Sequence, residues 1–502
     1  MNNNMQTNTD TGARPPRPGV AGERGRWKHR SRRLLLVLPV LATFAGWHVY
    51  KPLPAGLDVA GPFRPARDLR FLRDITYTAA DGSRRFDQQI FDEVLAMIAG
   101  ADSLLVIDMF LFNDFTGRED RIHRALSREL TDAIIARRQA RPVLRCWLIT
   151  DPINTWYGGL GAAHLDRLRA HGVTVVTTRL SALRDSNPAH SLWWRLLLRF
   201  WPHRFGPMLP NPVTGGRVPL RSYFDLFNFK ANHRKTVIAD RQGVPTALVT
   251  SANPHDASSA HHNVAVVFSG AAVADLLATE AAVCAMSGAP VPEAVPEPVA
   301  AEPDAPTPLR IRVLTERAVE RAVLELLERA RAGDTVTLAM FYLASRPVVR
   351  ALEQAHRRGA GVSVLLDPNK DAFGREKNGI PNRPVAAELM AAGIPVRWVQ
   401  TCGEQFHTKL LVLETAGGEL ATILGSSNYT RRNLHNLNLE TSVEIRSPRD
   451  AVFSASVRDY LALAWRTQPL PVISGDYGTY ADPSRWRRIL YRLQEATGLS
   501  TF

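Results

Sequence analysis

The chain has 502 residues, more than one ordinary domain holds, which indicates two or three domains. Its hydrophobic fraction of 45% and charged fraction of 22% are those of a globular protein and exclude a largely disordered chain. The formal net charge of +14 suits an anionic partner, for which phospholipid and nucleic acid qualify equally. The cysteines Cys146, Cys284 and Cys402 lie far apart without metal-ligand spacing, and we interpret them as inert thiols.

The N-terminal region has a polar part and an apolar part. Residues 1–33 are rich in Pro, Gly and Asn and end in a basic run, so we expect a disordered, basic cytoplasmic tail. Residues 34–50 are apolar, and as a helix they would span about 25 Å, close to a membrane core of about 30 Å. They are predicted to be a transmembrane anchor, with a cleaved signal segment as the alternative. We therefore expect an inner-membrane anchor and an exported catalytic part.

The remainder contains an internal repeat. A Pro/Ala-rich stretch, 287–309, is predicted to be a stiff linker between the similar segments 51–286 and 310–475. Each segment has an amphipathic helix, an apolar strand, an Arg-rich helix and a second strand that ends in Asp-Pro, at Asp151 and Asp367. Those two acids either shape a pocket entrance or only end their strands. The alternation predicts an α/β fold of two pseudo-symmetric halves, each a mixed, largely parallel sheet with helices on both faces.

The strongest correspondence between the halves is an H-x-K string that ends in an acid and is followed by a Ser and an Asn. The matching residues are His233, Lys235, Asp240, Ser251 and Asn253 in the first half, and His407, Lys409, Glu414, Ser426 and Asn428 in the second. One such string is weak evidence. Because two copies occur at equivalent places of two similar segments, chance does not explain them.

These residue types suit displacement at phosphorus. In a strand, residues two apart point to the same side, so the His and Lys of each string share a face. Together the two halves would surround a phosphate with two His, two Lys and two Asn, and no metal or cofactor is expected. One neutral His can attack phosphorus while the other, protonated, donates to the leaving alkoxide. The Lys and Asn side chains would stabilise the developing charge.

This constellation resembles the phospholipase D superfamily, whose members carry paired H-x-K-x4-D motifs. The second half, with LLDPNKDAFG and GSSNYTRRNL, is most similar to bacterial cardiolipin synthase-like members. The resemblance implies a phosphodiesterase or phosphatidyltransferase with its active site between the halves. It also implies a phosphohistidine intermediate, with His233 as the nucleophile and His407 as the acid and base. Nothing in this sequence sets that order.

The resemblance further implies a carboxylate, some thirty residues past each motif histidine, that orients an imidazole. Glu440 occupies this place in the second half, whereas Ala265 stands at the corresponding place in the first. One histidine would therefore lack its carboxylate, unless His262, Asp256 or a residue elsewhere supplies the contact. The acids Asp240 and Glu414 are interpreted as supporting residues.

Two segments outside the repeat combine aromatic and basic residues. An insertion at about 183–230 contains Trp193, Trp194, Leu197 and Trp201 at helical spacing with arginines among them, and residues 476–502 repeat the theme around Trp486. We interpret both as basic amphipathic helices in the lipid headgroup region, with packing on the core as the alternative.

The leading functional hypothesis is a monomeric enzyme that hydrolyses or transfers phospholipid phosphodiesters at a membrane surface, without a nucleic acid partner. The alternatives are an exported nuclease with the same site and an inactive lipid-binding scaffold. A nuclease should show a long basic groove with stacking aromatics, and no such run is found in the sequence. Whether water or an alcohol accepts the phosphatidyl group stays open.

Overall fold

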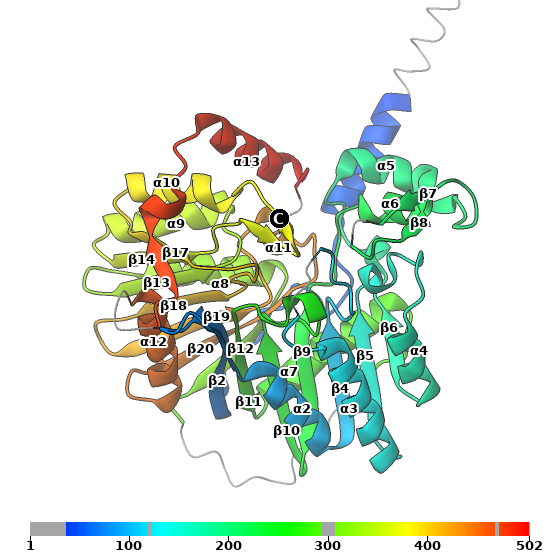
Figure 1. Cartoon of the computed structure of the whole chain (residues 1–502), viewed down its shortest axis with the longest axis horizontal. Coiled ribbons are helices and arrows are strands. Elements are labelled where there is room, and N and C mark those ends of the chain that lie inside the picture. Colours follow the sequence, from blue (N-terminus) through cyan, green and yellow to red (C-terminus); the bar gives the residue numbers. More distant parts are fainter. Residues whose placement is uncertain (1–36, 119–121, 212, 294–306, 467–470, 501–502) are drawn as a thin grey trace, which may run out of the picture. The chain divides into compact units, whose positions relative to one another are not determined.

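The computed structural model describes residues 37–118, 122–211, 213–293, 307–466 and 471–500 (Figure 1). The chain divides into two units, 1–50 and 51–502. In the first unit, residues 37–50 form a helix, and the predicted tail lies outside the described residues. No helix in the described part of the chain is both long enough and apolar enough to cross a membrane. Because residues 34–36 are not described, the predicted anchor stays a prediction.

The second unit contains two large mixed sheets, one from each half of the repeat (Figure 1). The first-half sheet has the order β3-β2-β11-β10-β9-β4-β5-β6. Its strands are β2 (Arg67–Thr78), β3 (Arg84–Gln88), β4 (Ala101–Met109), β5 (Arg145–Thr150), β6 (Thr174–Thr177), β9 (Lys235–Arg241), β10 (Val244–Thr250) and β11 (Asn263–Ser269).

The second-half sheet has the order β1-β12-β20-β19-β18-β13-β14-β17-β21, so its seven central strands repeat the first sheet from β2 to β6. Its strands are β1 (Arg64–Pro65), β12 (Arg310–Thr315), β13 (Thr335–Met340), β14 (Gly361–Leu366), β17 (Val396–Val399), β18 (Lys409–Glu414), β19 (Glu419–Gly425), β20 (Thr441–Pro448) and β21 (Ser474–Asp476). Two mixed α/β halves are therefore confirmed.

The expectation of largely parallel sheets was wrong. Only β4, β5 and β6, and likewise β13, β14 and β17, run parallel, whereas the remaining neighbours in both sheets are antiparallel. The reason lies in the connections. The strands that follow each motif are joined by short turns, such as Gln242-Gly243 between β9 and β10, and a short turn can only reverse the chain.

Helices cover the outer face of each sheet. These helices are α2 (Ile90–Gly100), α3 (Leu126–Ala140) and α4 (Ala163–Ala170) in the first half, and α8 (Arg317–Arg329), α9 (Arg346–Arg357) and α10 (Asn382–Ala391) in the second. Their apolar faces pack on the sheets in two separate clusters, which include Val94 with Ile107 and Val323 with Leu338. Because the apolar residues recur at helical spacing, they lie on one face of each helix, and that face is buried against the sheet.

The inner faces of the two sheets share a third apolar core, which includes Val264 and Val266 of β11 with Leu410 of β18 and Val443 of β20. The helices α7 (Ala272–Ser287) and α12 (Val452–Trp465) also belong to this core, and each contacts a strand of the other half. The first-half helix α7 contacts β12, and the second-half helix α12 contacts β2. The prediction of helices on both faces of each sheet was therefore only half right, since each inner face packs mainly against the other half.

The insertion and the C-terminal segment form their own small elements. They are η2 (Leu180–Ala182), α5 (Pro188–Leu196), η3 (Leu198–Phe200), β7 (Met208–Pro210), β8 (Arg217–Pro219) and α6 (Leu220–Leu226), and then η5 (Tyr477–Tyr480) and α13 (Arg485–Thr497). Within the insertion, Trp194 is buried and donates to Asp225 Oδ1 of α6 at 2.6 Å, whereas Trp193 and Leu197 are exposed. This part of the insertion therefore has a buried side and an exposed side.

Five short elements complete the described chain: η1 (Pro152–Thr155), η4 (Asp256–Ser258), β15 (Asp371–Ala372), β16 (Arg375–Glu376) and α11 (Arg431–Leu434). Residues 288–293 and 307–309 of the predicted linker form neither helix nor strand, and 294–306 lie outside the described residues.

Candidate active site

Each motif histidine stands immediately before a strand, at a point fixed by a buried acid. The backbone N–H of Asn232 donates to Asp151 Oδ2 at 2.7 Å, and that of Phe406 donates to Asp367 Oδ2 at 2.7 Å. Both acids follow the second parallel strand of their sheet, and both are buried. Asp151 and Asp367 therefore hold the entry of the motif strands in each half, a more specific role than ending a strand.

The halves join at the motifs through backbone contacts. His233 N donates to Leu439 O at 2.9 Å, and His262 N donates to Gln405 O at 3.0 Å. The loop that ends in Glu440 is thus held against the first motif, and the loop that ends in Asn263 against the second.

Each motif imidazole is also held by a residue of the opposite half. His233 Nδ1 lies 3.0 Å from Glu440 Oε1, and His407 Nδ1 lies 3.1 Å from Asn263 Oδ1. Both acceptors are oxygens, so each Nδ1 carries the proton and each Nε2 is left for chemistry. Ser251 Oγ donates to Asn263 Oδ1 at 2.9 Å, and Ser426 Oγ donates to Glu440, which holds both acceptors in place.

Ala265 is not the first-half counterpart of Glu440, as the sequence spacing had suggested. Thr250 pairs with Ala265 across the first sheet, and Gly425 pairs with Ser442 across the second, so the connecting loop is two residues longer in the second half. The structural counterpart of Glu440 is Asn263. His407 therefore does lack a carboxylate, and a neutral amide takes its place.

The side chains of both motif lysines are buried. Lys235 Nζ donates to His233 O at 2.8 Å and Lys409 Nζ to His407 O at 2.7 Å. Each ammonium also lies over an aromatic ring, at 5.1 Å from Phe110 and 5.0 Å from Phe341. The lysines thus stand directly behind the histidines.

Phe110 and Phe341 are site residues that the sequence analysis missed. Each ring also contacts the histidine of its own half, with centroids 4.8 Å and 4.9 Å apart. Both follow a Met at the end of an apolar strand, as Met-Phe-Leu and Met-Phe-Tyr. Aligning the two halves residue by residue would have found them.

A cavity of about 550 Å³ opens between the halves, a size that suits a small-molecule or headgroup site. His233, Asn253, His407 and Asn428 all line it. Asn428 Oδ1 is buried and has no hydrogen-bond partner among the described residues, so this acceptor is available to a donor group of a ligand. The structure thus brings both motif histidines and both asparagines to one cavity.

Of the three other histidines near the first motif, only His261 lines this cavity, with its ring centroid 6.0 Å from that of His407. His255 and His262 are buried elsewhere and do not line it. All three lie in the loop between β10 and β11 and are buried.

Burial and mutual repulsion set the charges of the site. Burial lowers the pKa of His233 to about 4, although Glu440 opposes the shift. Burial also lowers the pKa of Lys235 to about 7, and the pKa values of His407 and Lys409 fall well below their usual range through burial and neighbouring cations. A bound phosphodiester anion would raise all four, because an opposite charge favours the protonated forms.

The acids that end the motifs lie away from the cavity and differ from each other. Asp240 accepts hydrogen bonds from the backbone of Ser103 at 2.9 Å and Leu104 at 2.9 Å, which ties β9 to the start of β4. Glu414 instead forms ion pairs with Arg449 at 2.9 Å and Arg458 at 3.6 Å. Both acids therefore contact neighbouring parts of their own half and do not reach the cavity.

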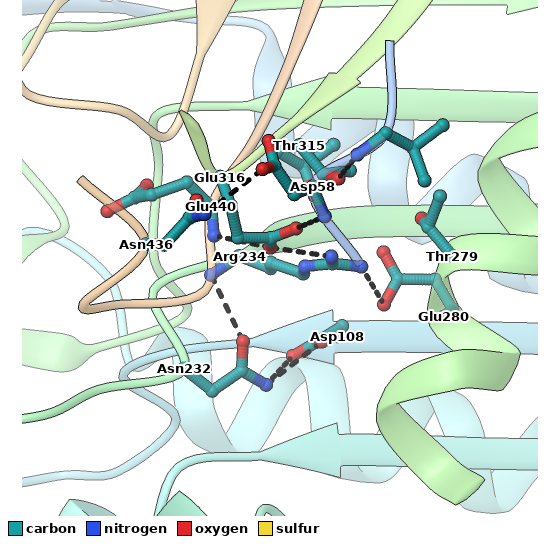
Figure 2. A network of polar contacts seen from close by, with 12 residues as sticks. Asp58, Asp108, Asn232, Arg234, Thr279, Glu280, Thr315, Glu316, Asn436 and Glu440 are labelled. Atoms are coloured by element: carbon teal, nitrogen blue, oxygen red, sulfur yellow. Dashed lines mark hydrogen bonds and ion pairs between the residues drawn. The ribbon is translucent and has the colours of Figure 1, made fainter. Parts of the chain in front are cut away.

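A buried polar network lies behind the first motif (Figure 2). Arg234, between the motif His and Lys, points away from the cavity and donates to Glu316 Oε1 at 2.7 Å, with Glu280 Oε2 at 3.5 Å. Glu316 Oε1 also accepts from the backbone N of Glu440 at 3.2 Å. The residue that orients His233 is therefore linked to the same network. No group of three or more potential metal ligands is found among the residues that the structure describes.

The family comparison falls on the second half. Residues 323–465 match the family model described as cardiolipin synthase, PLD-like domain. This segment contains His407, Lys409 and Asn428, and the first half repeats its strand order and its motif. The second half therefore contains a phospholipase D-like domain of this family. No curated protein sequence matches it.

Three solved structures are similar to this chain. Phosphatidylserine synthase from Haemophilus influenzae Rd KW20 is 10% identical, over 88% of this chain and 96% of that chain, with a TM-score of 0.53. Polyphosphate kinase from Porphyromonas gingivalis is 13% identical over 86% of this chain, which spans about half of the kinase (53%), with a TM-score of 0.45. The phospholipase D family member Nuc from Salmonella typhimurium is 18% identical over 30% of this chain and 90% of that chain, with a TM-score of 0.23. The likeness to the phosphatidylserine synthase structure shows that the two chains share a fold.

Proposed function

We propose that this protein hydrolyses or transfers the phosphodiester of a phospholipid through a phosphohistidine on His233. The observation that carries the proposal is the pair of imidazoles in one cavity, each held at Nδ1 by an acceptor from the opposite half. Such a pair supplies a nucleophile and an acid for in-line displacement at phosphorus.

The different Nδ1 partners support the assignment of roles. Glu440 stabilises positive charge on His233 as its Nε2 bonds to phosphorus, while burial keeps that ring neutral beforehand, with its pKa at about 4. His407, beside the neutral amide of Asn263, is the more readily deprotonated acid. In the first step the N–P bond forms, the P–O bond breaks, and His407 donates its proton to the leaving oxygen.

The second step reverses the roles. His407 takes a proton from water or an alcohol, whose oxygen attacks phosphorus as the bond to His233 breaks. Lys235 and Lys409 lie behind the reacting rings and stabilise the negative charge of the phosphoryl oxygens. Asn253 and Asn428 are the amides placed to donate to those oxygens.

A lipid substrate is supported by the surface beside the cavity. Phe227 lines the cavity and is 43% exposed, and Phe200 and Trp201 of the neighbouring insertion are 65% and 44% exposed. On the other side of the cavity, α13 exposes Trp486 by 68%. Aromatic residues with arginines nearby are typical of protein surfaces that contact lipid headgroups.

In Figure 1, α5 and α13 lie toward the same end of this unit. A contact at Gly498, just after α13, agrees with this placement, since a Cβ there would lie 2.2 Å from Ser186 O, just before α5. A membrane surface could therefore contact both segments at once. We further propose that residues 34–50 anchor a monomeric, exported catalytic part at that membrane.

The test is headgroup release and transfer by the detergent-purified full chain on phosphatidylglycerol vesicles. The His233→Ala variant should lose at least about 1,000-fold in rate, because the nucleophile is removed. His171→Ala, at an exposed histidine after α4, is the matched control and should keep its activity. Turnover of single-stranded DNA without turnover of any lipid would overturn the lipid assignment, and equal activity of His233→Ala would overturn the mechanism.

A further inference from the structure

A third histidine of the active-site cavity belongs to neither motif. His261 lies in the loop between β10 and β11, lines the cavity and is 4% exposed. Its ring stacks on that of Phe373, with centroids 6.0 Å apart and planes 17° apart, and its centroid lies 6.0 Å from that of His407. Asn263, which orients His407, also donates from Nδ2 to His261 O at 3.1 Å. The same short segment therefore brings two side chains to the second motif histidine.

The tautomer of His261 is opposite to that of the motif histidines. Its Nδ1 accepts from the backbone N–H of Gln405 at 3.3 Å, so the proton of the neutral ring is on Nε2. Burial lowers the pKa of His261 well below its usual range, and nearby positive charge, including that of Lys409, adds to the shift, so the ring stays neutral. Nε2 is buried and has no hydrogen-bond partner among the described residues. A buried N–H without an acceptor is destabilising, which indicates that a bound molecule supplies the acceptor.

The second half has a matching residue of a different type. Asn438 and His261 each stand two residues before the residue that orients the opposite histidine, and both line the cavity. Asn438 Oδ1 accepts from the backbone N–H of Ala231 at 3.0 Å, two residues before the first motif histidine. Gln405, which donates to His261, stands two residues before the second. Because the contact recurs in both halves, the two residues hold equivalent places in the site, and only the second motif histidine has an imidazole there.

We propose that His261 is a catalytic hydrogen-bond donor, which binds through Nε2–H the oxygen that exchanges a proton with His407. The proposal rests on the proposed function and deepens it, because it adds a third group on the His407 side of the reaction. Two hydrogen bonds of about 2.9 Å that meet at one oxygen reach about 5 Å, which fits two rings whose centroids are 6.0 Å apart.

In the first step this oxygen is the leaving oxygen, which takes its proton from His407 Nε2. In the second step it is the oxygen of water, which bonds to phosphorus while one of its protons passes to His407 Nε2. The bond from phosphorus to His233 Nε2 breaks, and its electron pair returns to the imidazole. His261 keeps its proton throughout and stabilises the negative charge that develops on the oxygen.

The experiment uses the full chain in mixed micelles with two substrates, phosphatidylglycerol and phosphatidyl-p-nitrophenol. p-Nitrophenolate is a stable anion that leaves without a proton, so its release in the first step does not need a donor at the leaving oxygen. In His261→Phe, rapid mixing should show a burst of about one p-nitrophenolate per active site and then turnover about 100-fold slower than in the wild type. Phosphohistidine should accumulate after the burst. On phosphatidylglycerol, where both steps need the donor, kcat should fall about 100-fold or more without a burst.

Two further variants separate the donor from a structural role. The amide nitrogen of Gln reaches the place of Nε2, so His261→Gln should keep more of the slow phase than His261→Asn, whose amide reaches only the place of Nδ1. A residue that merely held the backbone of Gln405 would give the opposite order. The matched control is His262→Phe, because that neighbouring ring packs against Phe406 and does not line the cavity, and it should keep wild-type turnover.

The outcomes distinguish this inference from the proposed function. Equal losses of the burst rate and of the slow phase in His261→Phe, wild-type turnover in that variant, or better retention in His261→Asn than in His261→Gln would each overturn the role of His261 and leave the proposed function standing. No wild-type turnover of either phospholipid would overturn both.

Discussion

Glu440 and Asn263 occupy equivalent places in the two halves and act on opposite histidines. The two acceptors differ by one full charge while their distances to Nδ1 are nearly the same, 3.0 Å and 3.1 Å. A carboxylate favours imidazolium, and an amide favours it much less. A single residue difference thus makes two otherwise similar imidazoles chemically unequal.

Replacing Asn263 by Asp should move the alkaline limb of the pH–rate profile of kcat. The new carboxylate would raise the pKa of His407 by about one to three units, so the acid stays protonated to higher pH. The alkaline limb should therefore move to higher pH by about one unit or more. The check is kcat measured from pH 5 to pH 10 on one phospholipid.

Glu440→Gln is the companion variant. Loss of the carboxylate should lower the pKa of His233 further. Because the proposed nucleophile reacts in its neutral form, the acid limb of the pH–rate profile of kcat should then move to lower pH. If Asn263→Asp moved the acid limb instead, the assigned roles of the two histidines would be reversed.

At the scale of elements, the two motif acids do different work despite their matching places. Asp240 accepts three backbone N–H groups, from Asp102, Ser103 and Leu104, where the first-half sheet begins a strand. Burial raises the pKa of Asp240, but the hydrogen bonds from Ser103 and Leu104 outweigh it, and the net shift is downward. Its contribution to stability is therefore present above its unfolded pKa and is lost as pH falls through the lower folded value.

Asp240→Ala should lower the free energy of unfolding by about 2 to 4 kcal/mol at neutral pH, because one buried and two partly buried backbone donors lose their acceptor. Glu414→Ala should cost less than about 1 kcal/mol, because its partners Arg449 and Arg458 are largely exposed. Urea unfolding of the two variants provides the measurement. Equal losses of unfolding free energy in the two variants would show that the two acids do not differ in their contribution to stability.

The exposed aromatic residues at the end of η3 and in α13 should govern binding to lipid. Trp201→Glu and Trp486→Glu should each weaken binding to phosphatidylglycerol vesicles at least tenfold, since each removes an apolar contact and adds repulsion. Val143→Glu, at an exposed apolar residue before β5 and away from both segments, is the control. Vesicle co-sedimentation measures binding, and retained binding in both tryptophan variants would exclude these segments as the contact surface.

At the scale of the whole molecule, the halves are joined by a shared apolar core and by one buried cation. Arg234 belongs to the first half, while Glu316 belongs to the second and is 0% exposed (Figure 2). Glu316 also accepts from the backbone N–H of Asp58 at 2.7 Å, a residue of the segment that precedes the first sheet. The ion pair therefore connects three parts of the unit at a point next to His233 and Lys235.

Arg234→Met should destabilise the protein by about 3 to 5 kcal/mol, because it leaves Glu316 and Glu280 buried without their cation. The residue at the same motif position in the second half is Thr408, whose hydroxyl contacts Tyr460 OH at 2.9 Å. Thr408→Val should cost about 1 kcal/mol, the worth of one hydrogen bond. Calorimetric unfolding compares the two, and a loss in Arg234→Met no greater than in Thr408→Val would show that the pair does not join the halves.

Much of the fold follows from local patterns that can be read along the chain. The repeat, the two mixed α/β halves and the paired His, Lys and Asn residues all depend on spacing within a strand or between neighbouring elements. Phe110 and Phe341 were within reach of the same reasoning, because they occupy equivalent places after matching strands. Sheet direction was misjudged, since it depends on which strands are joined by short turns.

Other features were decided only by tertiary structure. Glu440 meets His233 across 207 residues, and no local pattern indicates that each half orients the histidine of the other. The sequence did not reveal that Asn263 is the counterpart of Glu440. The loop between β10 and β11 is two residues shorter than the loop between β19 and β20, and only the pairing of these strands shows which residues correspond. His261 likewise reaches the cavity beside His407 only through the packing of one half against the other. The sequence by itself therefore determined which chemical groups the protein has, whereas packing between the halves decided which of them meet.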